Sequence, residues 1–313
     1  MDEFKLIHHY FATAGCARGG ESIALGIGDD CALLQPSPNH QLAISTDSLV
    51  ETVHFPVQAD PALLAQRALA VNLSDLAAMG AEPLGFTLAL TLPSADQQWL
   101  TAFAEGLNQA ALQHAISLIG GDTTRGPLSL TLTVLGQVPV GQALVRSGAQ
   151  VGDLLCVSGV LGAANLALPW VLQPSTAESA QTQQLLTAYW QPQPQLALGR
   201  ALRQRATAAL DISDGLLADA GHLAKASGVG LVIDAHLVPC VVDLPLAQAL
   251  PAALTGGDDY HLVFTLPPQH LAIIQSAFPN VRAIGQVVAG AGVELINFAA
   301  ATDVKVQPGY THF

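Results

Sequence analysis

Short runs that combine aspartate with glycine, serine or threonine recur along the chain, and they hold the side chains best suited to chemistry. The chain has 17 aspartates but only 7 glutamates, so its acidic groups are concentrated in the shorter side chain. Carboxylate and hydroxyl oxygens are the ligands that Mg²⁺ prefers, and glycine lets the backbone approach a ligand closely. Six runs together predict a site for magnesium and a nucleotide triphosphate: GIGDD at 26–30, STDS at 45–48, NLSD at 72–75, GGDTT at 120–124, DISDG at 211–215 and GGDDY at 256–260.

Most of these runs also have a plainer explanation. GIGDD could be a surface turn, STDS a turn at the end of a strand, and DISDG a helix cap. Asp75 is harder to explain in this way, because it lies in a predicted apolar helix with Asn72 on the same face. A carboxylate there is costly to bury without a partner. Arg67 could be that partner, but it lies eight residues earlier, so a metal role is the favoured interpretation.

Backbone groups and basic residues refine the prediction. The glycines of GGDTT are expected to turn N–H groups toward phosphate oxygens. The sequence has three lysines, no G-x-x-x-x-G-K-[ST] loop and no HRD or DFG kinase signature, so magnesium would offset most of the phosphate charge. Arg146 could help, because a guanidinium binds phosphate at two points, although a solvated surface arginine fits the sequence equally well. His54 is the histidine nearest the acidic runs, but a lone histidine is more often structural.

Length and composition bound the fold and the location. At 313 residues, half of them hydrophobic and with a mean hydropathy of +0.41, the chain is expected to form two domains. A net charge of −13 argues against a nucleic-acid partner. The first residues are acidic where a signal peptide needs a basic start, and the four cysteines are widely spaced, so a cytoplasmic protein is expected. The uncharged stretch 154–177 could span a bilayer, but its glycines and proline predict a buried strand, turn and short helix.

Strand and helix patterns occur in both halves and predict an α+β fold of two domains, residues 1–140 and 141–313. Asp60 and Pro61 are expected to begin a helix that ends at Gly80, and the Gln/Pro-rich stretch 190–195 is expected to separate two helices. A long helix is predicted over 96–118. Strands are predicted at 41–46, 85–92, 128–134, 208–212, 230–233, 260–265 and 281–287.

Taken in order, these runs and their flanking residues resemble the thiamine-monophosphate kinase family over essentially the whole chain. The matched blocks are GIGDDCALL, ISTDSLVETVHF, ALAVNLSDLAAMGA, IGGDTTRGPLSLTL, RSGAQVGD, LDISDGLLAD and GGDDY. This family belongs with the aminoimidazole-ribonucleotide and selenophosphate synthetases. The resemblance implies an N-terminal domain that binds ATP and magnesium and forms a β-barrel across a homodimer. It also implies a C-terminal α/β domain that completes the active site, with ATP bound between the domains.

The implied reaction is ATP-dependent phosphorylation of thiamine monophosphate to thiamine diphosphate, the last step of thiamine diphosphate biosynthesis. In-line transfer between the two phosphates needs no covalent nucleophile. Carried over by motif, several magnesium ions would be bound by Asp30, Ser45, Thr46, Asp47, Asp75, Asp122, Asp211 and Asp214. ATP would be contacted by Gly121, Asp122, Arg146 and Ser213, and thiamine monophosphate by His54, Asp258 and Tyr310.

The chain departs from the family pattern at Asp258, where glutamate is usual, and before Tyr310, where a tryptophan is often found. Both departures concern the substrate pocket more than the metal ligands. Two rival functions stay open: another ATP-dependent synthetase of the same superfamily, and a non-catalytic nucleotide-binding scaffold. A selenophosphate synthetase would need a reactive cysteine near a lysine, whereas Cys16 has only Arg18 nearby. A scaffold should have lost some metal carboxylates, yet every motif here retains its own.

Overall fold

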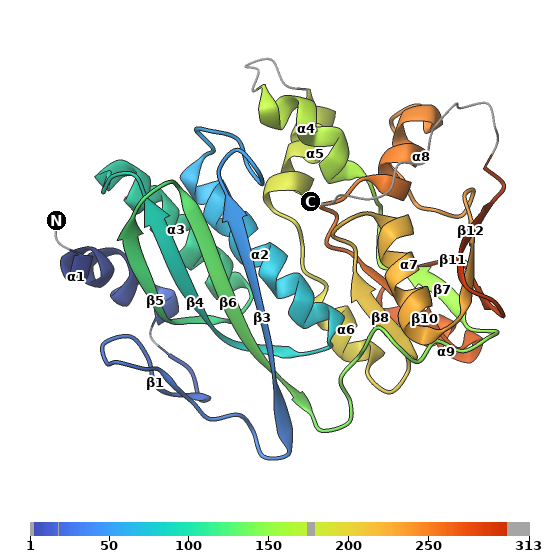
Figure 1. Cartoon of the computed structure of the whole chain (residues 1–313), viewed down its shortest axis with the longest axis horizontal. Coiled ribbons are helices and arrows are strands. Elements are labelled where there is room, and N and C mark those ends of the chain that lie inside the picture. The colour runs from blue at the N-terminus through green and yellow to red at the C-terminus, as the bar shows by residue number, and fades with distance from the viewer. Residues whose placement is uncertain (1–2, 18, 174–178, 299–313) are drawn as a thin grey trace. The chain divides into compact units, whose positions relative to one another are not determined.

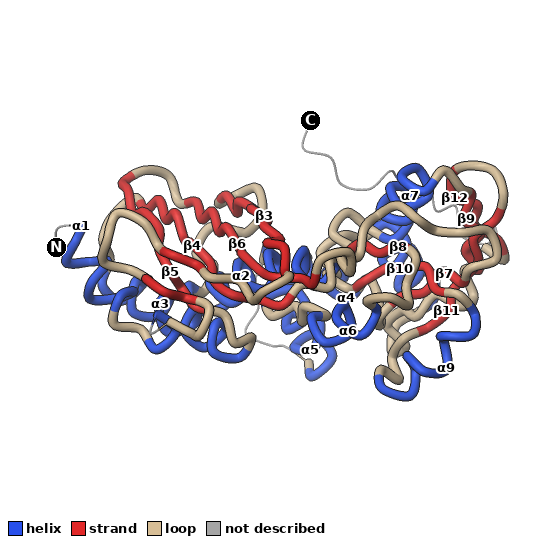
Figure 2. Tube along the Cα trace, turned by 90° about the horizontal axis from the view of Figure 1, so that it is seen from below, coloured by secondary structure: helices blue, strands red, loops and turns tan. Residues whose placement is uncertain are grey.

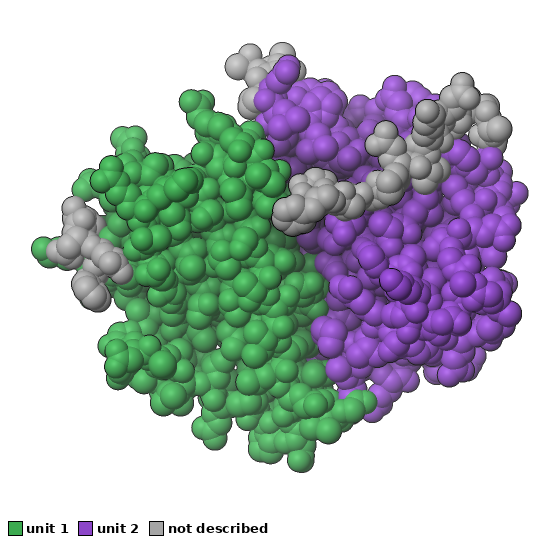
Figure 3. Space-filling model, in the orientation of Figure 1, with its two compact units in different colours: residues 1–76, 81–141 green, residues 77–80, 142–313 purple. Residues whose placement is uncertain are grey.

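The chain forms two compact units in the computed structural model, which describes residues 3–17, 19–173 and 179–298. Unit 1 comprises residues 1–76 and 81–141, and unit 2 comprises residues 77–80 and 142–313 (Figure 3). Both units mix helices with a sheet, which confirms the predicted two-domain α+β fold. Among the described residues, no helix has both the length and the apolar character needed to cross a membrane.

Unit 1 is built on a four-stranded sheet with the strand order β3-β6-β4-β5, in which β4 and β5 are parallel and the other neighbours antiparallel. Helices α2 and α3 cover one face of this sheet (Figure 2). Within the described residues the sheet is open and forms no closed barrel. The elements are α1 (Glu3–Leu6), η1 (Ile7–Ala12), η2 (Gly15–Ala17), β1 (Ile23–Leu25), β2 (Leu33–Leu34), β3 (His40–Val50), α2 (Pro61–Ala78), β4 (Glu82–Leu92), α3 (Gln97–Gln113), β5 (Ser117–Arg125) and β6 (Ser129–Pro139).

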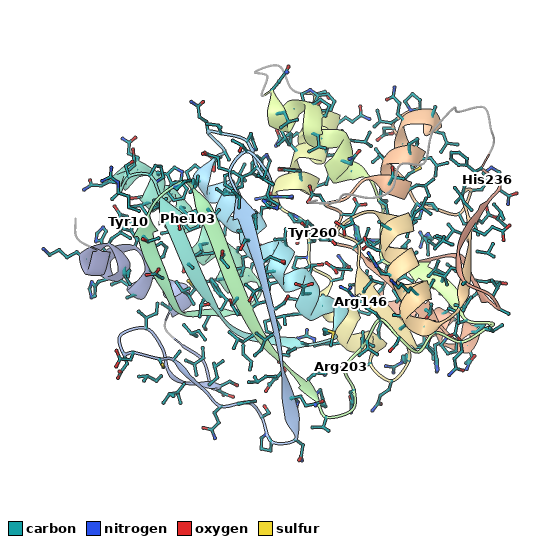
Figure 4. All side chains as sticks on the ribbon, viewed as in Figure 1. Tyr10, Phe103, Arg146, Arg203, His236 and Tyr260 are labelled. Atoms are coloured by element: carbon teal, nitrogen blue, oxygen red, sulfur yellow. The ribbon has the colours of Figure 1, made fainter. Side chains whose placement is uncertain are left out.

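The alternation of residues along β6 explains why one face of the sheet carries the core. Leu130, Leu132 and Val134 are fully buried, whereas Thr131 and Thr133 stand between them on the open face. Phe103 of α3 belongs to the same core and is also fully buried (Figure 4). The hydroxyl-rich pattern of this segment therefore belongs to a half-covered strand, as predicted.

Helix α2 begins as the sequence predicts. The Asp60 carboxylate accepts hydrogen bonds from the N–H groups of Ala62 and Leu63 at 2.9 and 3.0 Å. Pro61 is the first helical residue, and Gly80 follows the helix with a φ of +63°.

The long helix predicted over 96–118 was too long. Helix α3 ends at Gln113, and Ala115 adopts a φ of +51°, which the helix cannot continue through. From Ser117 onward the chain pairs with β4 in a parallel ladder. Apolar residues without a clear helical period were the reason for the error, because such a run can form a buried strand as readily as a helix.

Unit 2 contains a six-stranded sheet with the order β12-β9-β11-β7-β10-β8, antiparallel except where β12 lies beside β9. Helices α7 and α9 lie on opposite faces of this sheet (Figures 1 and 2). Strand β7, the following turn and α4 confirm the predicted reading of residues 154–172. The elements are β7 (Leu154–Val157), α4 (Ala163–Leu172), α5 (Ala180–Trp190), α6 (Leu196–Leu202), β8 (Ala208–Asp211), α7 (Leu216–Ser227), β9 (Gly230–Asp234), α8 (Leu246–Thr255), β10 (Leu262–Leu266), α9 (Pro268–Ala277), β11 (Arg282–Val288) and β12 (Gly292–Ile296).

Candidate functional site

Two carboxylates of unit 1 meet where β3 faces α2. The Ser45 hydroxyl donates to Oδ2 of Asp75 at 2.5 Å. The Asp47 N–H donates to Oδ1 of Asn72 at 3.1 Å, and the buried Asn72 amide donates in turn to the Ala68 carbonyl at 2.9 Å. Helix α2 thus fixes the backbone of the edge strand β3 beside the acidic residues. Ser45 and Asp47 both face α2 because alternate residues of a strand share one side.

The two carboxylates repel each other. The pKa of Asp47 is raised to about 6, first because the surrounding protein removes water from its carboxyl, and then by the charge of Asp75 and a hydrogen bond with it. Much of the Asp47 side chain is nevertheless exposed, so the pair is accessible to an ion. A divalent cation would remove this repulsion. The oxygens of Ser45, Asp47 and Asp75 therefore fit magnesium.

The structure does not bring the side chains of Thr46 and Asp122 to this pair. The Thr46 hydroxyl lies 2.9 Å from that of Thr133 on the open face of the sheet. Asp122 lies within β5 opposite Ala89, in the row of residues that continues through Thr131 on the same open face. Both side chains are exposed, and their predicted roles as magnesium ligands stay predictions.

Asp30 is exposed in the turn between β1 and β2. Its N–H donates to Oδ1 of Asp29 at 2.8 Å, so Asp29 shapes the turn as a short polar side chain commonly does. The carboxylate of Asp30 remains a candidate metal ligand on the basis of the motif alone.

His54 is held in a tight turn that follows β3. The Val50 N–H donates to Nδ1 of His54 at 3.0 Å, and the Val50 carbonyl accepts the His54 N–H at 2.9 Å. Because Nδ1 accepts a hydrogen bond, the neutral ring carries its proton on Nε2. The ring is therefore fixed as an N–H donor, which suits an anionic oxygen such as that of a phosphate.

In unit 2 the DISDG run joins β8 to α7. Asp211 ends β8 and is only 6% exposed, and Ser213 and Asp214 follow it, half-buried, just before the helix. The N–H groups of Ser213, Asp214 and Gly215 all donate to Oδ2 of Asp219, at 3.1, 3.0 and 3.1 Å. Burial raises the pKa of Asp219 to about 7, against the lowering effect of these hydrogen bonds.

The GGDDY run lies directly beside this loop. The Asp258 N–H donates to the Ser213 carbonyl at 2.9 Å, and the Tyr260 N–H donates to the Ile212 carbonyl at 2.8 Å. The Tyr260 hydroxyl donates to Oδ1 of Asp258 at 3.1 Å. Asp258 and Tyr260 have φ values of +69° and +51°, a region that non-glycine residues enter only rarely. The two acidic runs of unit 2 are therefore one structural feature.

Two side chains that the sequence did not single out, Asp259 within the GGDDY run and His261 directly after it, anchor the same loop. Both oxygens of Asp259 accept the Gly162 N–H, at 2.8 and 2.9 Å, and burial raises the pKa of Asp259 well above its ordinary value. The Ser158 hydroxyl lies 2.8 Å from Nδ1 of His261 and also accepts the Leu262 N–H at 2.9 Å. Polar residues that continue a motif into a buried strand were the available signal for both.

Arg146 is an exposed residue of unit 2, and its carbonyl accepts a hydrogen bond from the Ser227 hydroxyl at 3.2 Å (Figure 4). An exposed guanidinium fits a phosphate contact and a solvated surface arginine equally well, so the predicted role of Arg146 stays a prediction. Tyr310 lies outside the described residues.

In the described part of the chain, Asp214, Asp219 and His222 form a group whose ligand atoms lie within 4.8 Å of one another. Oδ2 of Asp219 already accepts hydrogen bonds from three N–H groups of the loop, so this oxygen is not offered as a metal ligand. Asp214 is the member that the sequence also predicts to bind magnesium.

Comparison with known proteins identifies the family. Residues 28–138 match the family described as AIR synthase related protein, N-terminal domain, and residues 139–297 match the corresponding C-terminal domain. The thiamine-monophosphate kinase of Salmonella typhimurium is 45% identical over 328 aligned residues, which cover 99% of this chain and 98% of that protein.

The chain belongs to the thiamine-monophosphate kinase family.

Solved structures of this family agree with the fold. The crystal structure of thiamine-monophosphate kinase from Stenotrophomonas maltophilia is 46% identical and superposes with a TM-score of 0.83 over 88% of this chain and 92% of that one. A structure of AaThiL complexed with AMPPCP and TMP is 28% identical, with a TM-score of 0.79 and 89% of each chain covered. The resemblance inferred from the sequence is confirmed.

The buried His261 predicts an acid-sensitive contribution to the stability of this family member. Burial lowers the pKa of His261 to about 4, below its ordinary value of 6.5. In the unfolded chain His261 is therefore protonated below about pH 6.5, whereas in the folded chain it is protonated only below about pH 4. This contribution is intact above pH 6.5 and falls by about 2 kcal/mol by pH 5.

The measurement compares urea unfolding of the wild type and His261→Asn at pH 7.5 and pH 5. Asparagine can keep a polar group within hydrogen-bond distance of the Ser158 hydroxyl, as Nδ1 of His261 does, but it does not titrate. The raised pKa values of Asp219 and Asp259 act in the opposite sense in both proteins, so only the difference between the proteins reports His261. Equal losses of stability in the two proteins would contradict the prediction.

Proposed function

We propose that this protein transfers the γ-phosphoryl group of ATP to thiamine monophosphate, giving thiamine diphosphate and ADP as the last step of thiamine diphosphate biosynthesis. The observation that carries the proposal is 45% identity to a thiamine-monophosphate kinase over 99% of the chain. The AaThiL complex with AMPPCP and TMP supports it, because an ATP analogue and TMP occupy a relative of the same fold. A cytoplasmic location stays a prediction.

The chain's own residues divide the proposed work as follows. Magnesium, when bound, would neutralise the two polyanionic substrates and the charge that develops on the transferred group. Ser45, Asp47 and Asp75 of unit 1, and Asp211 and Asp214 of unit 2, present oxygens suited to it. Asp30, Thr46 and Asp122 are retained as further ligands on the motif alone.

Substrate contacts are proposed for residues with suitable donors. Nε2–H of His54 would donate to the phosphate of thiamine monophosphate, and the Arg146 guanidinium would pair with a phosphate of ATP. Gly121, Asp122 and Ser213 would complete the ATP contacts. Asp258 would face thiamine monophosphate, and its hydrogen bond with Tyr260 fixes where its shorter side chain points. Tyr310 keeps its proposed place against the thiamine ring.

A homodimer is also proposed, with the N-terminal sheets completing a β-barrel. Strand β3 is an edge strand of the sheet. Its Leu42 and Ile44 are 44% and 60% exposed, an unusual exposure for large apolar side chains on one face of an edge strand. Pairing with a second copy would cover both the edge and these side chains.

One rival activity is disfavoured by the thiol chemistry. A selenophosphate synthetase needs a reactive cysteine near the N-terminus. Cys16 is 4% exposed, and burial raises the pKa of its thiol, so little thiolate forms at neutral pH.

A panel of acceptors tests the proposal. Purified protein, ATP and Mg²⁺ are incubated separately with thiamine monophosphate, thiamine, formylglycinamidine ribonucleotide and selenide, and ADP and phosphorylated products are quantified. We expect ADP and thiamine diphosphate with thiamine monophosphate alone. Turnover of formylglycinamidine ribonucleotide instead would replace the activity and leave the fold assignment intact, and binding of ATP without turnover of any acceptor would favour a scaffold.

A further inference from the structure

Asp219 accepts a set of hydrogen bonds that ordinary helix capping does not require. It lies in the first turn of α7 and is 3% exposed, and one of its oxygens, Oδ2, accepts three successive N–H groups from residues 213–215. The N-cap position of α7 is Gly215, which has no side chain to serve the free N–H groups of the helix start. Asp219 therefore reaches back from within the helix and closes the loop on itself.

Three successive N–H groups that converge on one point form a nest, which commonly binds an external anion such as phosphate. Here the chain's own carboxylate occupies that point. The backbone N–H groups of Ser213 and Asp214 thus donate to Asp219, and a ligand of this loop would be contacted by the side chains of these two residues. This is the reverse of a glycine-rich phosphate loop, in which the N–H groups bind the ligand and the side chains are incidental.

The carbonyl side of the same loop is fixed as well. The Ser213 carbonyl accepts the Asp258 N–H and the Ile212 carbonyl accepts the Tyr260 N–H. Gly215 has a φ of +113°, and a Cβ there would lie 2.9 Å from the Thr255 backbone, so the turn has little room to rearrange. On the N–H side of the loop, the Asp219 carboxylate accepts all three of the N–H groups of residues 213–215.

We propose that Asp219 is a positioning residue for phosphoryl transfer, which holds Ser213 and Asp214 where they contact ATP and magnesium. The inference rests on the proposed function and on the roles of these two residues in it. Asp219 itself would touch neither substrate nor metal through Oδ2. Substitution of Asp219 should therefore displace the loop, weaken the binding of Mg·ATP and lower kcat by more than a loss of folding stability would explain.

The test compares Asp219→Ala and Asp219→Asn with matched changes at Asp153. Asp153 is likewise buried, at 5% exposure, and accepts the Gln150 N–H at 3.0 Å and the Thr207 hydroxyl at 2.6 Å. Asp153 directly precedes β7 and bonds to Thr207, the residue before β8, whereas the DISDG loop lies at the opposite end of β8. Its substitution therefore measures the effect of losing a buried carboxylate away from that loop. Each protein is assayed for kcat, for KM of ATP and of thiamine monophosphate, for melting temperature, and for calorimetric binding of Mg·ATP without acceptor.

We expect Asp219→Ala to raise the KM for ATP by at least about tenfold and to lower kcat, since it removes the acceptor of the three N–H groups that hold the loop. Asp219→Asn keeps an acceptor oxygen but not the charge, so its KM for ATP should rise by roughly threefold. Asp153→Ala should lower the melting temperature to a similar extent with the KM for ATP within about twofold of wild type.

An unchanged KM for ATP in Asp219→Ala, with a melting temperature lowered as in Asp153→Ala, would overturn the proposal and leave Asp219 a stabilising residue only. If Asp219→Ala does not fold, Asp219→Asn against Asp153→Asn decides in the same way. Failure of the proposed function looks different, because wild type would then form no thiamine diphosphate. In that case the calorimetric binding of Mg·ATP still compares the same variants.

Discussion

Asp75→Asn should reduce kcat/KM by at least roughly 100-fold, about 2.7 kcal/mol of transition-state stabilisation, while the metal-free protein stays as stable as the wild type or becomes more so. Asp75 is one of two carboxylates that repel each other, and its charge contributes to the raised pKa of Asp47. Removing that charge relieves the repulsion in the absence of metal. The same change removes a ligand that magnesium needs, so activity and stability should move in opposite directions.

Two measurements decide this prediction. Steady-state assays give kcat/KM. Melting temperatures measured without Mg²⁺ and at Mg²⁺ concentrations raised in tenfold steps give the stabilisation by the metal. We expect this stabilisation in the wild type and its loss in Asp75→Asn. Asp96→Asn is the matched control, because it removes the same charge from unit 1 at the N-cap of α3, where asparagine caps equally well. A melting temperature that falls by several degrees in Asp75→Asn, with activity falling only in proportion, would mean that Asp75 serves the fold instead.

Asp75 also illustrates what a single sequence can predict. A carboxylate inside an apolar helix stands out because its burial is costly, and the structure places it beside Ser45 and Asp47 from a separate strand. The resemblance listed all three among the magnesium ligands, but only the structure shows that the Ser45 hydroxyl donates to Asp75. Local signals were equally reliable for the start of α2, where Asp60 and Pro61 act through neighbouring residues alone.

Several of the errors and omissions involve contacts between segments far apart in the chain. Thr46 was grouped with Ser45 and Asp47, but the alternation of a strand turns its side chain to Thr133 on the other face. Asp259 was not given a role because its partner in the structure is the N–H group of Gly162, which lies 97 residues earlier in the chain. No spacing rule within the GGDDY run could identify that partner.

Asp219 is a more instructive omission, since its partners are close in sequence. The run DISDGLLAD contains every residue of the arrangement. An aspartate in the first turn of a helix is normally explained by the helix dipole, and that explanation is sufficient without the loop. Only the folded structure shows that its oxygen accepts the N–H groups of the loop that contains Ser213 and Asp214. The sequence therefore named the proposed ligands and not the residue that we propose orients them.

The GGDTT run gives the second large effect, because the structure requires one of its two glycines, Gly121, for a different reason than the sequence predicted. Both lie inside β5 and not in a loop. Gly121 has a φ of +155°, and a Cβ there would lie 2.0 Å from the Leu88 carbonyl oxygen of the neighbouring strand. At Gly120 the nearest atom to a new Cβ would be a methyl group of Thr87 at 3.7 Å, an ordinary contact.

Gly121→Ala should therefore destabilise the protein by about 3 kcal/mol or more, because β4 and β5 must separate to admit the methyl group. Gly120→Ala should change the free energy of unfolding by less than about 1 kcal/mol, and in the stabilising direction if the strand accepts alanine without strain. Urea unfolding of the two variants and the wild type measures both effects. Since each variant keeps its N–H group, activity lost in Gly121→Ala but kept in Gly120→Ala would trace to displacement of the neighbouring Asp122. Equal unfolding midpoints would instead show that β4 yields at Leu88 at little cost, and that the close approach of the two strands is not what demands glycine at this position.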